Sequence, residues 1–263
     1  MDITNPEKEH TILEIDNLTI GYENKKVCSA ISFAVKRGEC AAIVGVNGIG
    51  KSTLLRTIGH LQPALGGTIR IDGTLISQMS MNNLAKRLSL VLTEPIASKN
   101  MTVKELIALG RQPYTNWMGS LGEMDIKKIS EAISMLELNH LADTKCYELS
   151  DGQLQRVMIA RALAQDTDII LLDEPTTHLD LFHKVQILKL LKSIAHQTKK
   201  TVLFTSHEIE IAIQLCDKIL ILEGDKNPFD EPCKLIENKA FERLFPLDTI
   251  RFDATTGTFC IQK

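Results

Sequence analysis

Residues 45–52 read Gly-Val-Asn-Gly-Ile-Gly-Lys-Ser, which fits the pattern G-x-x-x-x-G-K-[ST]. A short apolar run precedes the pattern, and apolar residues at helical spacing follow it. This order predicts a buried strand, a loop whose N–H groups point at an anion, and a helix whose N-terminus adds positive potential. The Lys51 amine would reach the β- and γ-phosphates, and the Ser52 hydroxyl would bind Mg²⁺. The stretch therefore predicts a nucleoside triphosphate site that is formed by Gly45, Asn47, Gly48, Gly50, Lys51, Ser52 and Thr53.

Two carboxylates, Asp173 and Glu174, directly follow an apolar run that is typical of a buried strand. Because ligands of open α/β sheets bind at the carboxyl ends of the strands, both side chains are expected beside the phosphates. Asp173 is placed to hold the Mg²⁺ shell, and Glu174 is the candidate general base for an attacking water. The alternative is a charged pair that only caps the strand, but the phosphate loop favours the functional interpretation.

His207 follows a second apolar run, residues 201–205, and is expected at the same edge of the sheet. An imidazole at that edge can hydrogen-bond the γ-phosphate or orient the water. A lone histidine is more often an ordinary surface or core residue. The matching strand edge favours a role in catalysis.

Ser150 is a good N-cap for an amphipathic helix that we predict over residues 151–165. The free N–H groups of the first helical turn would form an anion site. The cap alone also explains these residues without any catalysis. Tyr22, between two expected strands, is best explained by its position alone as a half-buried aromatic residue of a turn.

The remaining chain predicts the elements that would position these side chains. Residues 12–20 and 27–35 are expected to form an antiparallel strand pair, and apolar strands alternate with helices after residue 151. Such alternation predicts a mainly parallel sheet that is covered on both faces. Residues 95–150 have a helical pattern with a loop over 110–122, and Thr102 with Glu105 forms a capping box. A short helix and a hairpin are expected near the C-terminus. The fold class is therefore α/β.

Composition excludes several classes of protein. A net charge of −3 argues against a large nucleic-acid footprint. Six widely spaced cysteines are expected to be reduced thiols of a cytoplasmic protein. The first ten residues do not have the pattern of a signal peptide, and no apolar run is long enough to span a bilayer. Any role at a membrane would then come through a partner.

Together the motifs resemble those of ATP-binding-cassette (ABC) ATPases, in the same order, over residues 12–225. Residues 45–52 match the Walker A loop, 169–174 the Walker B strand, 149–153 the signature motif, 177–180 the D-loop, and His207 the switch histidine. The resemblance implies a P-loop NTPase fold with an antiparallel β subdomain and an inserted helical subdomain. It divides the chain into a tail (1–11) and a single ATPase domain (12–263), with a core (12–94 and 151–225), a helical subdomain (95–150) and a C-terminal extension (226–263).

The resemblance also implies a head-to-tail homodimer in which each ATP, with Mg²⁺, lies between two subunits. Tyr22 would stack on adenine. The remaining contacts would come from Ser150, Gly152, Gln153 and Asp180. In such a dimer, ATP would hold the two subunits together through contacts to its γ-phosphate. Hydrolysis and loss of phosphate would remove these contacts and let the subunits separate.

Two positions depart from the family pattern. Asp151 replaces the first glycine of the signature motif, and we expect it to point to solvent. Thr93 occupies the place of the Q-loop glutamine, with Glu94 beside it, so Thr93 or Glu94 would have to supply the third Mg²⁺ ligand. These departures bear on the coupling of hydrolysis.

Residues 108–114, Ala-Leu-Gly-Arg-Gln-Pro-Tyr, resemble a Gly-Arg-x-Pro segment of importers for iron–siderophore, haem and cobalamin. This implies an ATPase subunit on the inner face of the cytoplasmic membrane. Its partners would be a permease dimer docked at the helical subdomain and Q-loop and, indirectly, a substrate-binding protein. The alternatives are a soluble ABC ATPase that acts as an assembly or interaction factor, and a subunit that binds ATP but hydrolyses it poorly.

Overall fold

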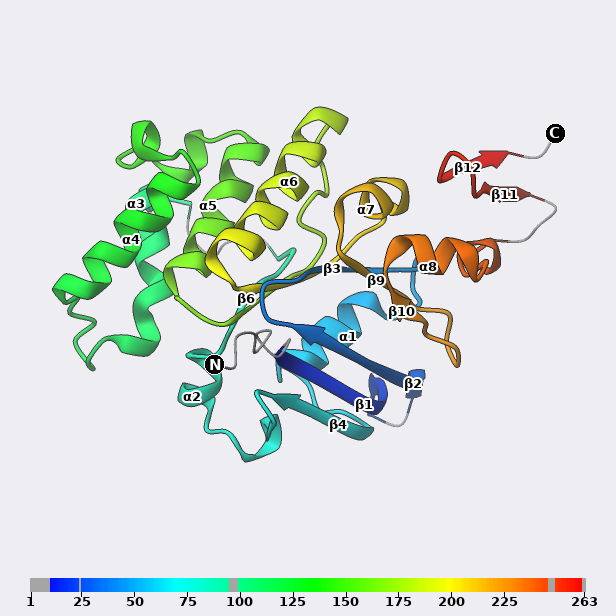
Figure 1. Cartoon of the computed structure of the whole chain (residues 1–263). Helices are drawn as coiled ribbons and strands as arrows, with labels where there is room; N and C mark the ends of the chain where they lie inside the picture. Colours follow the sequence, from blue (N-terminus) through cyan, green and yellow to red (C-terminus); the bar gives the residue numbers. More distant parts are fainter. Residues whose placement is uncertain (1–9, 24, 95–98, 246–248, 262–263) are drawn as a thin grey trace, which may run out of the picture.

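The computed structural model describes residues 10–23, 25–94, 99–245 and 249–261, so most of the expected tail lies outside the described residues. Its centre is a six-stranded sheet in the order β10-β9-β3-β8-β7-β6 (Figure 1). All neighbouring strands are parallel except β10 and β9. The strands are β3 (Cys40–Val44), β6 (Leu88–Val91), β7 (Ile169–Leu172), β8 (Thr201–Thr205), β9 (Lys218–Ile221) and β10 (Phe229–Asp230). The predicted mainly parallel sheet is confirmed.

A second, antiparallel sheet has the order β2-β1-β4-β5. It contains β1 (Thr11–Tyr22), β2 (Lys25–Lys36), β4 (Gly66–Ile71) and β5 (Thr74–Leu75). Leucines of helix α1 (Lys51–Ile58) share a buried cluster with residues of both sheets, so α1 and this sheet cover one face of the central sheet. Tyr22 is the last residue of β1 and not part of the link, because the two strands pair as far as Tyr22 and Lys25.

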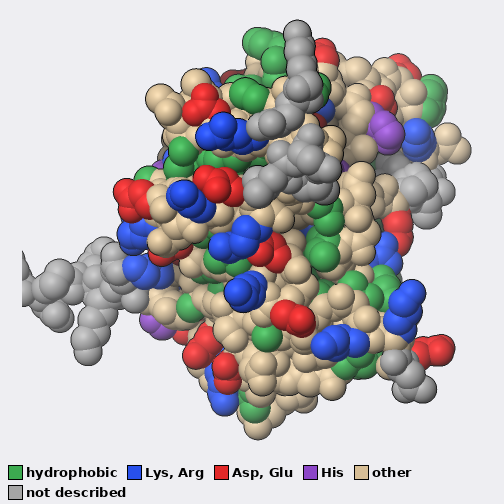
Figure 2. All heavy atoms as spheres, turned by 90° about the vertical axis from the view of Figure 1, so that its right-hand side faces the viewer, with side chains coloured by type: hydrophobic (Ala, Val, Ile, Leu, Met, Phe, Trp, Pro, Cys, Tyr) green, Lys and Arg blue, Asp and Glu red, His purple; other side chains and the backbone are tan. Residues whose placement is uncertain are grey.

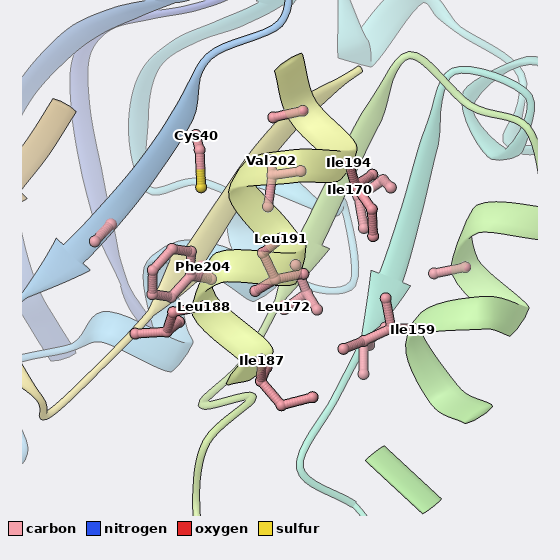
Figure 3. Packing of buried hydrophobic residues seen from close by; sticks show 14 of the residues in the cluster. Cys40, Ile159, Ile170, Leu172, Ile187, Leu188, Leu191, Ile194, Val202 and Phe204 are labelled. Atoms are coloured by element: carbon pink, nitrogen blue, oxygen red, sulfur yellow. The ribbon is translucent and has the colours of Figure 1, made fainter. Parts of the chain in front are cut away.

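Helices cover the other face of the central sheet. Figure 3 shows side chains of α6 (Leu181–Thr198), among them Leu188 and Leu191, packed over Leu172 and Phe204 of the strands, with Ile159 of α5 (Asp151–Ala164) beside them. The prediction that residues 151–165 form an amphipathic helix is wrong in part. The helix exists, but its second half, from Val157 to Ala164, is almost entirely buried between the helical segment and the sheet.

The helical segment contains α3 (Val103–Ala108) and α4 (Glu123–Met135), which pack against α5 (Figure 1). Short helices connect them: η2 (Leu109–Tyr114), η3 (Asn139–Leu141) and η4 (Cys146–Glu148). Two further short helices, η1 (Ile76–Gln78) and α2 (Met81–Ala85), lie between β5 and β6, outside the helical segment. The Thr102–Glu105 capping box of α3 is confirmed by both of its hydrogen bonds.

The predicted loop over 110–122 is wrong at its start, because residues 109–114 form the 3₁₀ helix η2. A buried side chain, Arg111, holds this turn in place. Its Nε donates to Asp125 at 2.8 Å, its Nη1 donates to the Ala164 carbonyl at 2.8 Å, and its guanidinium carbon lies 3.9 Å from the centre of the Tyr114 ring. Next to it, a Cβ on Gly110 would lie 2.2 Å from the carbonyl oxygen of Arg161 in α5. The Gly-Arg-x-Pro segment therefore packs directly on α5.

The C-terminal part contains α7 (Ile209–Leu215), α8 (Pro232–Glu237), η5 (Phe241–Arg243) and the predicted hairpin, which is formed by β11 (Ile250–Asp253) and β12 (Thr258–Ile261). Phe252 contacts Phe241 and Phe259, and the Phe259 N–H donates to Glu210 of α7 at 2.8 Å. Figure 2 shows the face at the right of Figure 1, where basic and acidic side chains alternate. Among the described residues, no helix is long and apolar enough to cross a membrane.

Candidate nucleotide site

In the loop between β3 and α1, Gly45, Gly48 and Gly50 all have a positive φ, and two of them are also closely packed. Gly45 has φ 153° and Gly50 has φ 112°. A Cβ on Gly45 would lie 2.7 Å from the carbonyl oxygen of Leu222, and one on Gly50 would lie 2.7 Å from a methyl carbon of Val27. The loop therefore packs closely against β2 and against Leu222, the residue after β9, so its glycines are needed for close packing as well as for the turn.

The Lys51 amine lies over this loop and donates to the carbonyl oxygens of Gly45 at 2.9 Å and Val46 at 3.2 Å. Burial lowers the pKa of Lys51, and the carboxylates of Glu174 and Asp173 partly oppose that shift. The amine is thus held at the loop by two neutral carbonyl acceptors. An anion can replace these carbonyls, because its hydrogen bonds to the amine are charge-assisted and stronger.

Asp173, at the end of β7, accepts hydrogen bonds from two hydroxyl groups. Ser52 donates to its Oδ1 at 2.9 Å, and Thr205, at the end of β8, donates to the same oxygen at 2.8 Å. Because β7 and β8 are parallel neighbours, their carboxyl ends meet beside the start of α1. The sheet therefore brings the loop serine and the strand carboxylate together, as expected.

Glu174 follows with φ 48°, the left-handed backbone conformation. Its N–H donates to the Thr205 hydroxyl at 2.8 Å. One carboxylate oxygen pairs with His207, and the other accepts from the Thr177 hydroxyl at 3.1 Å. The predicted base and the predicted switch histidine therefore meet in one chain.

These groups surround a cavity of about 350 Å³, which we call the phosphate cavity. Tyr22 stands near it, with its hydroxyl 3.1 Å from that of Thr53 and 54% of the residue exposed. The lining residues are Asn47, Gly48, Gly50, Lys51, Ser52, Thr53, Glu174 and His207.

A neighbouring cavity of about 250 Å³, the side cavity, shares Glu174 with the phosphate cavity and is also bordered by Asp173 and Asp151. Asp151 is exposed, as we expected. Thr93 and Glu94 also border the side cavity. The Glu94 carboxylate forms an ion pair with Arg56 of α1 at 2.8 Å.

The residues expected to contact ATP from a second subunit lie elsewhere. Ser150 and Gln153 form the capping box of α5, in which each side chain accepts a hydrogen bond from the other's backbone N–H. None of Ser150, Gly152 and Gln153 is among the described residues that line the phosphate cavity. Asp180 caps the N-terminus of α6 and pairs with His183, 2.9 Å from its ring. Within the described part of one chain, the structure thus brings the Walker residues and His207 together at the phosphate cavity, whereas the signature motif contributes only Asp151, at the side cavity.

Sequence reasoning missed Thr205 and Arg56, and it placed Thr177 in the D-loop without its contact to Glu174. Thr205 precedes His207 by two residues at a strand end, which is the one signal that could have identified it. The hydrogen bond of Thr177 to Glu174 depends on a turn. The ion pair of Arg56 with Glu94 depends on the approach of two separate segments.

Comparisons with known proteins agree with this geometry. The family model for ABC transporters matches residues 28–177. The achromobactin transport ATP-binding protein of Dickeya dadantii is 33% identical over 90% of this chain and 89% of its own length. The petrobactin import ATP-binding protein YclP of Bacillus subtilis is 35% identical over 91% and 96%. Among solved structures, the ATP-binding cassette MJ0796, a dimer in a post-hydrolysis state with ADP and phosphate, superposes with a TM-score of 0.71 and 29% identity over 84% of this chain and 99% of its own. The phosphate loop, the carboxylates at the strand ends and these relatives lead to one conclusion: the chain belongs to the ABC transporter family, as an ATP-binding subunit that hydrolyses ATP.

Proposed function

We propose that this chain is the ATPase subunit of an importer for iron chelates of the siderophore type. The observation that carries the proposal is the similarity, over nine-tenths of the chain, to ATP-binding proteins named for achromobactin transport and petrobactin import. The Gly-Arg-x-Pro segment agrees with it. Haem and cobalamin are the other cargoes of the importers that this segment resembles.

The residues present fit ATP with Mg²⁺. Ser52 and Asp173 place two hard oxygen donors 2.9 Å apart at the mouth of the phosphate loop, which suits a magnesium ion. Thr93 and Glu94 border the same side cavity as Asp173. Because Glu94 is already paired with Arg56, Thr93 is the better placed third donor. When bound, Mg²⁺ offsets the negative charge of the transferred phosphoryl group.

The protein's own groups would then divide the chemistry. Lys51 would leave its carbonyl partners for the phosphate oxygens, together with the N–H groups of the loop. Glu174 would accept the proton of the attacking water, and His207, already paired with Glu174, would hold it in place or contact the γ-phosphate. Tyr22 would stack on adenine, since it is exposed at the rim of the phosphate cavity.

A homodimer completes this site in the proposal. Ser150, Gly152, Gln153 and Asp180 of one copy would face the nucleotide of the other. The free N–H groups at the start of α5 suit a γ-phosphate. The helical subdomain and the Q-loop would receive a permease dimer, so the chain would work at the inner face of the cytoplasmic membrane, with the substrate-binding protein contacting only the permease.

The test uses the chain co-expressed with a multi-span permease that co-purifies with it. We expect ATP hydrolysis by the complex and ATP-dependent uptake of a ferric siderophore into vesicles. A Glu174→Gln complex should bind ATP and turn over at least about 100-fold more slowly. Hydrolysis without uptake of ferric siderophore, haem or cobalamin would overturn the importer assignment in favour of a soluble assembly factor.

A second candidate, a subunit that binds ATP but hydrolyses it poorly, is favoured by Asp151, whose carboxylate borders the same side cavity as Glu174. The same experiment separates the two candidates. Equal, negligible rates for the wild-type and Glu174→Gln complexes, with the permease present, would favour the second candidate.

A further inference from the structure

Two threonine hydroxyls bond to Glu174: that of Thr205, which lies outside the matched motifs, and that of Thr177, the first residue of the stretch that matches the D-loop. Thr205 is fully buried at the end of β8, and Thr177 is exposed in the turn that follows β7. Both hydroxyls bond directly to Glu174, one at its backbone N–H and one at its carboxylate.

The Thr205 hydroxyl connects two functional groups. A hydroxyl has one proton and two lone pairs, so it can accept from the Glu174 N–H at 2.8 Å and donate to Asp173 Oδ1 at 2.8 Å at the same time. The Glu174 N–H has left the strand ladder, whose last backbone bond here runs from the Asp173 N–H to the Val91 carbonyl at 2.8 Å. Without Thr205, this N–H would have no hydrogen-bond partner in the protein that the structure describes.

Thr177 acts on the other end of the same residue. Its N–H donates to the Glu174 carbonyl at 3.2 Å, which closes a turn, and its hydroxyl donates to Oε2 of the carboxylate at 3.1 Å. Oε1 is taken by His207. Because Glu174 has a left-handed backbone (φ 48°), a conformation that persists only where the surroundings impose it, these bonds determine where the carboxylate points.

We propose that Thr205 and Thr177 are positioning residues for ATP hydrolysis: Thr205 fixes the backbone of Glu174 relative to Asp173, and Thr177 orients the carboxylate. The inference rests on the assignment of Glu174 as the base. Neither hydroxyl lines the phosphate cavity, so both affect the rate of the chemical step and leave ATP binding intact.

The test compares Thr205→Val, Thr205→Ser, Thr177→Val and Thr177→Ser. We expect kcat to fall about 10- to 100-fold in Thr205→Val and about 3- to 10-fold in Thr177→Val, with KM for ATP within about twofold, and the serine variants to recover most of the rate. Thr201→Val is the matched control. Thr201 is equally buried at the other end of β8, and its hydroxyl donates to the Lys36 carbonyl at 2.9 Å, far from Glu174. It should lose stability but keep kcat.

A second readout is independent of turnover. Amide hydrogen exchange should accelerate in the peptide that spans residues 173–177 in Thr205→Val and remain unchanged there in Thr201→Val. If Thr205→Val does not fold, Thr177→Val, at an exposed site, decides the kinetic question. Rates within twofold of wild type in the valine variants, or losses that serine does not restore, would overturn the inference. Glu174→Gln is measured alongside: if it hydrolyses ATP normally, the assignment of the base fails; if it is inactive while both valine variants are normal, only the positioning role fails.

Discussion

The phosphate-loop end of the central sheet and the N-terminus of α5 are both expected to bind the same nucleotide, yet they differ in how completely one chain builds them. At the first, four elements (β7, β8, α1 and the turn after β7) bond to one another through Ser52, Asp173, Glu174 and Thr205. At the second, the side chains of Ser150 and Gln153 each accept a hydrogen bond from the other's backbone N–H. The first region is positioned before any ligand arrives. Among the described residues, the side-chain hydrogen bonds of Ser150 and Gln153 do not reach the first region.

This difference fits the proposal that a single chain carries two halves of one nucleotide site. A pre-positioned half keeps the reorganisation needed for catalysis small. The half at α5 stays exposed because its N–H groups are expected to meet a phosphate held by another copy. The following variants would break or sharpen that contrast.

Lys51→Ala should have the largest effect. Removing the amine leaves the loop carbonyls of Gly45 and Val46 without their donor and removes the one cation of the phosphate cavity among its described lining residues. We expect ATPase activity to fall about 100- to 1,000-fold, with weaker nucleotide binding measured by fluorescence titration. Lys189→Ala, at an exposed position of α6, serves as the control. Undiminished hydrolysis by Lys51→Ala would contradict the assignment of the loop.

Ser150→Ala should lower the ATPase rate about 10-fold while a single subunit still binds ATP, because the lost contact is made to the nucleotide of a second copy. Mixing this variant with Lys51→Ala sharpens the test. Mixed dimers contain one site with an intact loop and an intact α5 N-terminus, so the mixture should exceed the summed rates of the two variants measured apart. A mixture that only reproduces that sum would argue that the two halves do not meet between copies.

Asp151→Gly should have a smaller effect, of the opposite sign. It removes a carboxylate that borders the side cavity with Glu174, so we expect the ATPase rate to rise about two- to fivefold. It also removes an acidic residue from the first turn of α5 and introduces a glycine there, which should lower the free energy of unfolding, measured by urea titration, by about 0.5–1.5 kcal/mol. An unchanged or lower rate would show that Asp151 does not oppose the nucleotide.

Tyr22→Phe should have the smallest effect. The ring that is expected to stack on adenine remains, and only the hydroxyl contact to Thr53 is lost. We expect KM for ATP to change less than about twofold, whereas Tyr22→Ala should raise it about fivefold or more through loss of stacking. Equal values for both variants would remove the stacking role.

Much of the fold and of this contrast could be predicted from local sequence pattern. The glycine loop, the carboxylates after an apolar run and the N-cap Ser150 each depend on neighbouring residues, so their local structures follow from short-range rules. The bonds of Thr205 and Arg56 could not be predicted, because they depend on how separate elements approach one another. The second half of α5 was misjudged for a similar reason: its burial on all sides depends on packing partners that are distant in sequence.

The packing of Gly110 against the Arg161 carbonyl changes how experiments on the importer-like segment should be read. A side chain at this position would push η2 away from α5, and Arg111 would lose its fit between Asp125 and the end of that helix. A transport defect in such a variant would therefore report internal damage to the cassette. Evidence for a permease contact has to come from exposed neighbours such as Trp117, whose replacement disturbs no packing inside the subunit.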